Sequence, residues 1–177
     1  MTTADQSRSV YQRAAQAALA ANPIGQLRLT VISQSMWPLL QLGEVVVIDT
    51  VDSAAAGDIV VVRRDAELIT HRLISTAGEQ WLTRGDNAVF VDAPVARTAC
   101  VGRVVAIEGH GRTIDLIAPR RVRLSRRLAQ LGRVQWRIQR GLHLTPGASP
   151  LSGRLAWLIG LPLRVLSHLI ARQVRAD

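Results

Sequence analysis

The sequence predicts a mainly β protein, with a compact β body between a short N-terminal helix and a helical C-terminal extension. Short segments rich in valine and isoleucine, separated by turn signals such as Gly-Asp and Gly-Glu, indicate the β body. After Pro119 the leucines recur at helical spacing instead, which indicates the extension. The expected strands are residues 27–31, 44–48, 58–63, 68–74, 80–83 and 101–107.

These patterns divide the chain into three parts. Residues 1–25 contain an alanine-rich helical stretch at 7–21 and a joint, residues 26–118 form the β body, and residues 119–177 form a basic amphipathic helical extension. Within the extension, a loop at 145–152 rich in Pro, Gly and Ser separates two helical patterns. In the second pattern, Pro162 is expected to kink the helix or restart it.

The positive charge is concentrated in the extension. The formal net charge is +9, and residues 120–140 carry eight arginines and no acidic residue. Aromatic residues are only 3% of the chain, and the arginine-rich helix also carries an apolar stripe, so the sequence argues against nucleic acid as a partner.

The single Cys100 excludes an intramolecular disulfide and has no ligand cluster around it. No metal or organic cofactor is implied.

The sequence contains no evident targeting segment. The first 22 residues lack the continuous apolar core of a secretory signal peptide. The most apolar run, residues 155–163, is broken by Arg164, whereas a membrane-spanning helix needs about 20 apolar residues. We therefore expect a cytoplasmic or peripheral membrane protein.

The absence of lysine restricts the chemistry available to a serine nucleophile. All 22 residues counted as lysine or arginine are arginine. A serine hydroxyl is usually activated by a neutral lysine or by a histidine that a carboxylate orients. Arginine stays protonated in proteins and cannot act as the base. A serine nucleophile in this chain must therefore use one of its four histidines.

Three short motifs follow one another in the β body. They are Ser33-Gln34-Ser35-Met36-Trp37-Pro38 with Gly43-Glu44 after it, Gly57-Asp58-Ile59-Val60-Val61 leading to Thr70-His71-Arg72, and Thr83-Arg84-Gly85-Asp86-Asn87 with Asp92 after it. Each motif alone is usually a turn, a half-buried strand residue or a hairpin. Together, in this order and without lysine, they resemble the signal peptidase family, specifically its Ser-His branch of ER-type and archaeal-like enzymes.

The resemblance assigns roles to five residues. Ser35 is implied as the nucleophile and His71 as the general base. Asp92 is the best match for the residue that orients the imidazole, while Asp86 matches a second family aspartate that either supports the site or orients His71 instead. The backbone N–H of Ser35 is the expected oxyanion donor, and the hydroxyl of Ser33 is a second.

The chain departs from the family pattern at two points. Glu44 stands where the family usually has aspartate after glycine. The N-terminal membrane anchor of signal peptidases is also missing. A basic amphipathic extension offers a replacement, because arginines contact anionic head groups while apolar residues enter the acyl boundary. The residues expected there are Leu124, Leu128, Leu131, Trp136 and Ile138. The alternative is a helical hairpin packed on the β body, with its arginines in solvent.

The expected function is a serine endopeptidase that cleaves a precursor peptide. The resemblance implies small side chains at the first and third positions before the cut, in a peptide bound as an added strand. One alternative is a LexA-like self-cleaving regulator, which is disfavoured because residues 7–21 are too short for a helix-turn-helix domain. The other is a degenerate peptidase fold used as a nucleic-acid- or membrane-binding module.

Overall fold

A computed structural model describes residues 26–50, 53–65, 67–77, 80–147 and 150–176. The helix predicted at 7–21, and with it the N-terminal part at 1–25, lies outside the described residues. Within the described ranges the chain forms strands as far as residue 115 and long helices from residue 119 onward.

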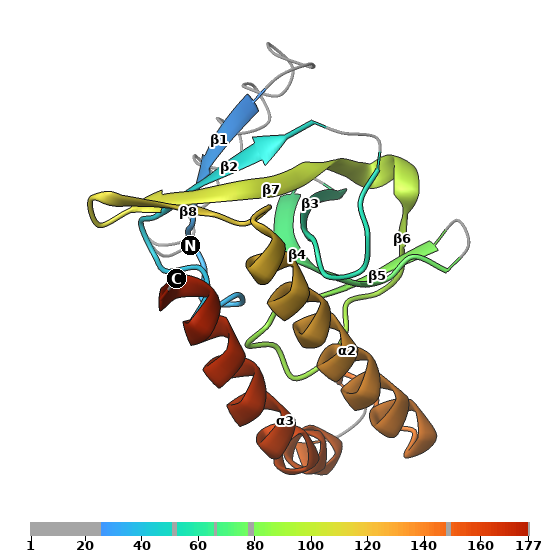
Figure 1. The fold of residues 1–177 in the computed structure, drawn as a ribbon. Helices are drawn as coiled ribbons and strands as arrows, with labels where there is room; N and C mark the ends of the chain where they lie inside the picture. The colour runs from blue at the N-terminus through green and yellow to red at the C-terminus, as the bar shows by residue number, and fades with distance from the viewer. Residues whose placement is uncertain (1–25, 51–52, 66, 78–79, 148–149, 177) are drawn as a thin grey trace, which may run out of the picture.

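The β body is one antiparallel sheet that curls around its core (Figure 1). Its strands are β1 (Gln26–Thr30), β2 (Val45–Asp49), β3 (Ile59–Arg64), β4 (Glu67–Ser75), β5 (Gln80–Arg84), β6 (Val95–Ala96), β7 (Cys100–Gly109) and β8 (Arg112–Asp115). The spatial order is β1-β2-β7-β3-β4-β5-β6, and β8 pairs with β7. The predicted fold class, mainly β with C-terminal helices, is confirmed.

The predicted strands agree closely with the observed ones because valine-rich, β-branched segments favour a pleated and half-buried surface. Two observed strands were not predicted. β6 has only two residues, too few to show a period. β8 follows a tight hairpin in which His110 and Gly111 both have positive φ angles. A histidine in that conformation gives no clear turn signal in the sequence.

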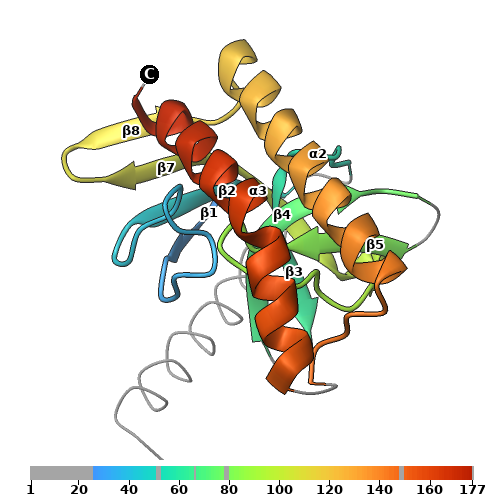
Figure 2. The same ribbon diagram turned by 90° about the horizontal axis from the view of Figure 1, so that it is seen from below.

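Two helices follow the sheet. α2 (Pro119–Gly141) begins with a proline, whose missing N–H costs nothing in the first turn of a helix. α3 (Pro150–Ala176) runs as one element through Pro162, and its axis bends along its length (Figure 2), so of the two expected outcomes the helix kinks and does not restart. Packing on both sides of the proline accounts for the continuity, since Ala156 precedes it, Ala171 follows it, and both are fully buried.

The helices belong to the same core as the sheet. Figure 2 shows α2 and α3 side by side across the strands. Leu124 and Leu128 of α2 are buried in one cluster with strand residues such as Ile48 and Ile107, and Ala171 and Val174 of α3 are in that cluster too. The prediction that Leu124 and Leu128 enter a lipid boundary is therefore wrong, because these side chains already face the β body.

Candidate active site

The turn after β1 carries Ser35. Its main chain is held by a second turn, after β5: the Asn87 N–H donates to the Ser35 carbonyl at 2.8 Å, and the Asn87 side-chain amide donates to the Gln34 carbonyl at 3.2 Å. The Ser35 hydroxyl is half-buried and lies 3.2 Å from the Ser33 hydroxyl, with either oxygen able to donate. The two serines expected to contribute to an oxyanion hole thus lie side by side.

β4 supplies His71 and Arg72, and their side chains point to opposite faces because they are successive residues of a strand. His71 Nδ1 lies 2.6 Å from Asp92 Oδ2. Arg72 instead binds both oxygens of Asp86, at 2.8 and 2.7 Å, and donates to the Gly57 carbonyl at 2.7 Å. Of the two aspartates that the sequence left open, Asp92 contacts His71 and Asp86 forms a buried ion pair with Arg72.

Asp92 is fixed by β5. The Thr83 hydroxyl donates to Asp92 Oδ2 at 2.7 Å, and the Asp92 N–H donates to the Thr83 carbonyl at 3.0 Å. An ionised carboxylate only accepts hydrogen bonds, so it places the proton of a neutral His71 on Nδ1 and leaves a lone pair on Nε2. That is the state of the imidazole that can accept a proton.

The free nitrogen of His71 faces the Ser35 turn across Gly85. A Cβ atom placed on Gly85 would lie 3.0 Å from His71 Nε2 and 2.6 Å from the Ser35 carbonyl oxygen. Any side chain here would separate the two residues. Within the described residues no hydrogen bond joins the Ser35 hydroxyl to His71, and the partner of that hydroxyl is Ser33. Catalytic hydrogen bonds are often absent without substrate and form in the complex.

Both C-terminal helices support the loops that carry these residues. Gln135 and Gln139 of α2 each donate to the Val89 carbonyl at 2.9 Å, which holds the loop between Gly85 and Asp92. Arg84 lies beneath the same loop and donates to the Ala88 carbonyl at 2.6 Å. Burial lowers the pKa of Arg84 to about 10.

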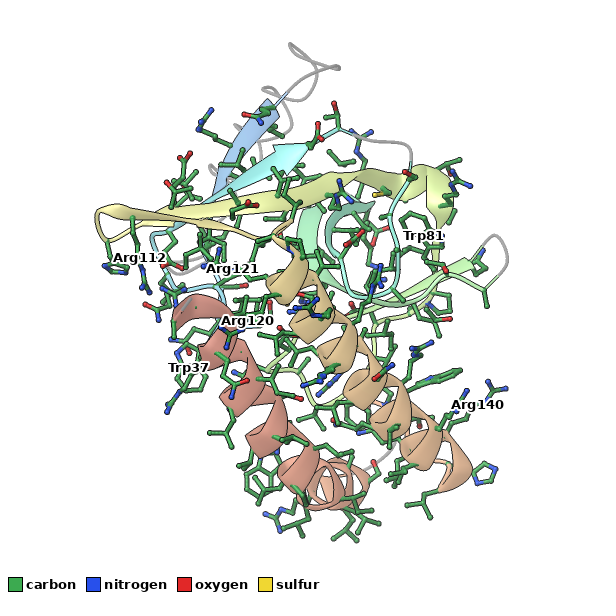
Figure 3. The ribbon with its side chains drawn as sticks, viewed as in Figure 1. Trp37, Trp81, Arg112, Arg120, Arg121 and Arg140 are labelled. Atoms are coloured by element: carbon green, nitrogen blue, oxygen red, sulfur yellow. The ribbon has the colours of Figure 1, made fainter. Side chains whose placement is uncertain are left out.

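α3 supports the Ser35 turn. Arg175 donates to the Leu39 carbonyl and to both oxygens of Glu44, at 2.9 and 2.6 Å. Burial acts to raise the pKa of Glu44, but hydrogen bonds from Arg175 and from the Gln41 N–H, with the charge of Arg175, hold it below its ordinary value of 4.5. Nearer the serine, Trp37 lies beside α3 (Figure 3). Its ring packs edge-on against His168 of that helix, with ring centroids 5.0 Å apart.

Sequence reasoning missed the supporting residues of the site. Thr83 and Gly85 belong to a motif that it noted, but the motif gives no indication of what each one contacts. Gln139 and Arg175 lie in the extension, and nothing in their local pattern connects them with residues of the β body. The described part of the chain contains no group of three or more His, Cys, Asp or Glu side chains able to hold a metal ion.

The comparison with protein families finds a match over much of the chain. A family model described as Peptidase S24-like matches residues 3–105, a range that contains Ser35, His71 and Asp92. The family includes signal peptidases and LexA-like self-cleaving repressors. No curated protein shows significant sequence similarity to the chain. Since the family model covers more than half of its length, the chain belongs to the Peptidase S24-like family.

Proposed function

We propose that this protein is a serine endopeptidase in which Ser35 is the nucleophile, His71 the general base and Asp92 the residue that orients the imidazole. The observation that carries the proposal is the 2.6 Å contact between His71 Nδ1 and Asp92, with Nε2 facing the Ser35 turn across Gly85. The absence of lysine supports it, because the lysine base of other serine peptidases has no counterpart in this sequence.

Catalysis begins with rotation of the Ser35 hydroxyl from Ser33 toward His71. His71 Nε2 takes the hydroxyl proton as Oγ attacks the peptide carbonyl, and Asp92 stabilises the imidazolium that forms. The Ser35 N–H and the Ser33 hydroxyl, freed by the rotation, donate to the oxyanion. The imidazolium then protonates the leaving amine, and a water molecule, deprotonated by the same nitrogen, hydrolyses the acyl-enzyme.

The substrate that we propose is a precursor peptide with small side chains at the first and third positions before the cut, as in ER-type signal peptidases. An extended peptide bound along a strand edge places alternate side chains on one face, so two small residues spaced by two fit such a surface. This preference rests on the resemblance of the motifs to that branch of the family. Self-cleavage, as in LexA-like proteins, is the competing outcome.

The test is hydrolysis of a fluorogenic Ala-x-Ala peptide by the full-length chain. Ser35→Ala and His71→Ala should each lower kcat by about 10³-fold or more, and the double variant should be little worse, because such residues act as a unit. Exposed Ser53 and His143 supply the matched controls Ser53→Ala and His143→Ala, which should leave the rate unchanged.

Mass spectrometry of the incubated chain detects self-cleavage in the same samples. A rate that survives Ser35→Ala would overturn the proposed nucleophile. Cleavage of the chain itself, with no turnover of any peptide, would assign the protein to the self-cleaving class.

A further inference from the structure

α3 has a continuous apolar face in solvent. Its side chains are between 45% and 74% exposed and recur at helical spacing along most of the helix. They are Leu151, Leu155, Leu158, Val165, Leu166 and Leu169, and we call them the α3 apolar face. Isolated exposed leucines are common on protein surfaces, but a contiguous row of this length marks an interaction site.

The opposite side of α3 is already committed to the β body. Ala156, Ala171 and Val174 are fully buried, and Arg175 binds Glu44. The α3 apolar face therefore cannot turn inward without breaking the core. The helix has apolar side chains on two opposite sides, and only one side has a partner among the described residues.

The charged residues near the α3 apolar face indicate what kind of surface binds to it. From Leu116 to Ala176 the sequence has twelve arginines and no acidic residue. Arg154 and Arg172 are exposed on α3 itself, and Arg137 is exposed near the end of α2. Arg140 is exposed at that end, from which the chain turns into α3 (Figure 3). An apolar face whose charged neighbours are all arginines fits a surface that is apolar below and anionic above, which describes a bilayer containing anionic lipids.

We propose that the protein binds the surface of an anionic membrane through the α3 apolar face, with α3 lying parallel to the bilayer. A second copy of the chain fits less well, because two such faces would bring like charges together. By length and composition alone, Leu151–Ala176 of α3 could cross a membrane, since an 18-residue stretch within it has a mean hydropathy of 1.3. In the folded protein, however, spanning would require the core contacts of Ala171 and Val174 to be lost.

This orientation brings the candidate active site close to the bilayer. Trp37 lies two residues from Ser35, is 37% exposed, and contacts His168 of α3. The Ser35 turn therefore borders the helix that lies on the membrane. The membrane proposal is independent of the peptidase proposal, because binding is measured without turnover and Ser35→Ala should bind as well as the wild type.

The experiment is co-sedimentation of the full-length protein with vesicles of phosphatidylcholine, with or without about 30 mol% phosphatidylglycerol. Binding should require the anionic lipid and weaken as salt is added. Leu158→Gln with Leu169→Gln should reduce affinity about tenfold or more, since two half-exposed leucines lose their burial in the acyl boundary. The matched control is Leu42→Gln with Ile117→Gln, of similar exposure in loops of the β body, and it should bind normally.

A second pair of variants tests the charge. Arg154→Gln with Arg172→Gln should weaken binding about tenfold or more, whereas Arg63→Gln with Arg112→Gln, on exposed positions of the β body, should change it little. Light scattering shows whether any variant changes the oligomeric state.

Four results would overturn the proposal. The first is that the protein does not bind anionic vesicles at low salt, and the second is that the α3 variants and their controls lose vesicle affinity equally. The third is that the protein does not bind vesicles and instead forms a dimer, which the leucine variant converts to monomer. The fourth is that neither high salt nor alkaline carbonate releases the bound protein from the vesicles. The last of these would mean that α3 spans the bilayer.

Discussion

Arg175 in the last turn of α3 and Glu44 beside β2 form a buried bidentate ion pair, although they lie 131 positions apart in the sequence. Arg175 also donates to the Leu39 carbonyl, so the end of α3 holds the turn that carries Ser35. The C-terminal helices therefore complete the candidate active site in addition to covering the sheet.

Removing one member of this pair should destabilise the fold. Arg175→Met leaves the Glu44 carboxylate buried without its partner, which costs about 3–5 kcal/mol. The double variant Arg175→Met with Glu44→Leu should recover much of that loss, because no charge then remains buried. Urea denaturation measures both, with exposed Arg172→Met as the control. Equal stability of Arg175→Met and wild type would contradict the structure at this point.

The same pair predicts how stability depends on pH. The pKa of Glu44 is lower in the folded protein than its ordinary value of 4.5. Its contribution to the free energy of unfolding is therefore fully present above about pH 5, and it is lost as the pH falls through the lowered pKa. Urea midpoints between about pH 6 and pH 3 should fall more steeply for the wild type than for Glu44→Gln. Parallel curves would show that Glu44 is not coupled to folding.

The two aspartates should respond differently to the same substitution. In Asp92→Asn the amide can donate to His71 Nδ1, which moves the ring proton to Nε2 and removes the base, so kcat should fall about 10³–10⁴-fold with the fold intact. In Asp86→Asn the buried Arg72 loses its counter-charge, so stability should fall by about 3–5 kcal/mol. Peptide hydrolysis and thermal unfolding separate the two effects. The reverse pattern would exchange the roles of the two residues.

Gly85→Ala tests the approach of His71 to the Ser35 turn. The added methyl would lie 2.6 Å from the Ser35 carbonyl oxygen, closer than real Cβ contacts, so the turn must move. If the Ser35 turn moves by about 1 Å to make room for the methyl group, kcat should fall about 10²-fold. Gly141→Ala is the matched control, because a Cβ there meets no atom within 4 Å. Full activity of Gly85→Ala would mean that the separation of the two residues is not critical.

The Val89 carbonyl accepts hydrogen bonds from two glutamines of α2. We therefore expect substitutions of these two glutamines to have non-additive effects on the free energy of unfolding. Gln135→Leu and Gln139→Leu should each have a small effect, because the other amide still satisfies the carbonyl of the half-buried Val89. The double variant leaves it without a donor and should cost about 1–3 kcal/mol more than the sum of the two single variants. Urea denaturation of all four proteins completes the cycle. Additive costs would show that the two bonds are independent.

The positions of the main strands, and the motifs that carry the candidate site residues, could be predicted from the sequence. Val45–Asp49 and Ile59–Arg64 are strands because their β-branched composition favours a pleat, and this is visible in a few residues. The family resemblance placed an aspartate beside His71, with Asp92 as the better match and Asp86 as the alternative, and only the structure shows that Asp92 makes the contact.

The helices were harder to interpret because their apolar residues do not indicate which partner they face. Leu128 is buried and Leu158 is exposed, yet both fit a helical stripe equally well. Partners separated by more than a hundred residues, such as Glu44 and Arg175, leave no local pattern at all. Their pairing depends on how α3 packs across the finished sheet.

The long separation between Glu44 and Arg175 also bears on timing. Contacts between residues far apart in sequence form late, since the intervening chain must first be ordered. A growing chain presents Ser35, His71 and Asp92 well before α3 has been synthesised. The hydrogen bonds from Arg175 to Leu39 and Glu44 can form only when the last helix docks, so a partly made chain contains the candidate site residues without this support of the serine turn.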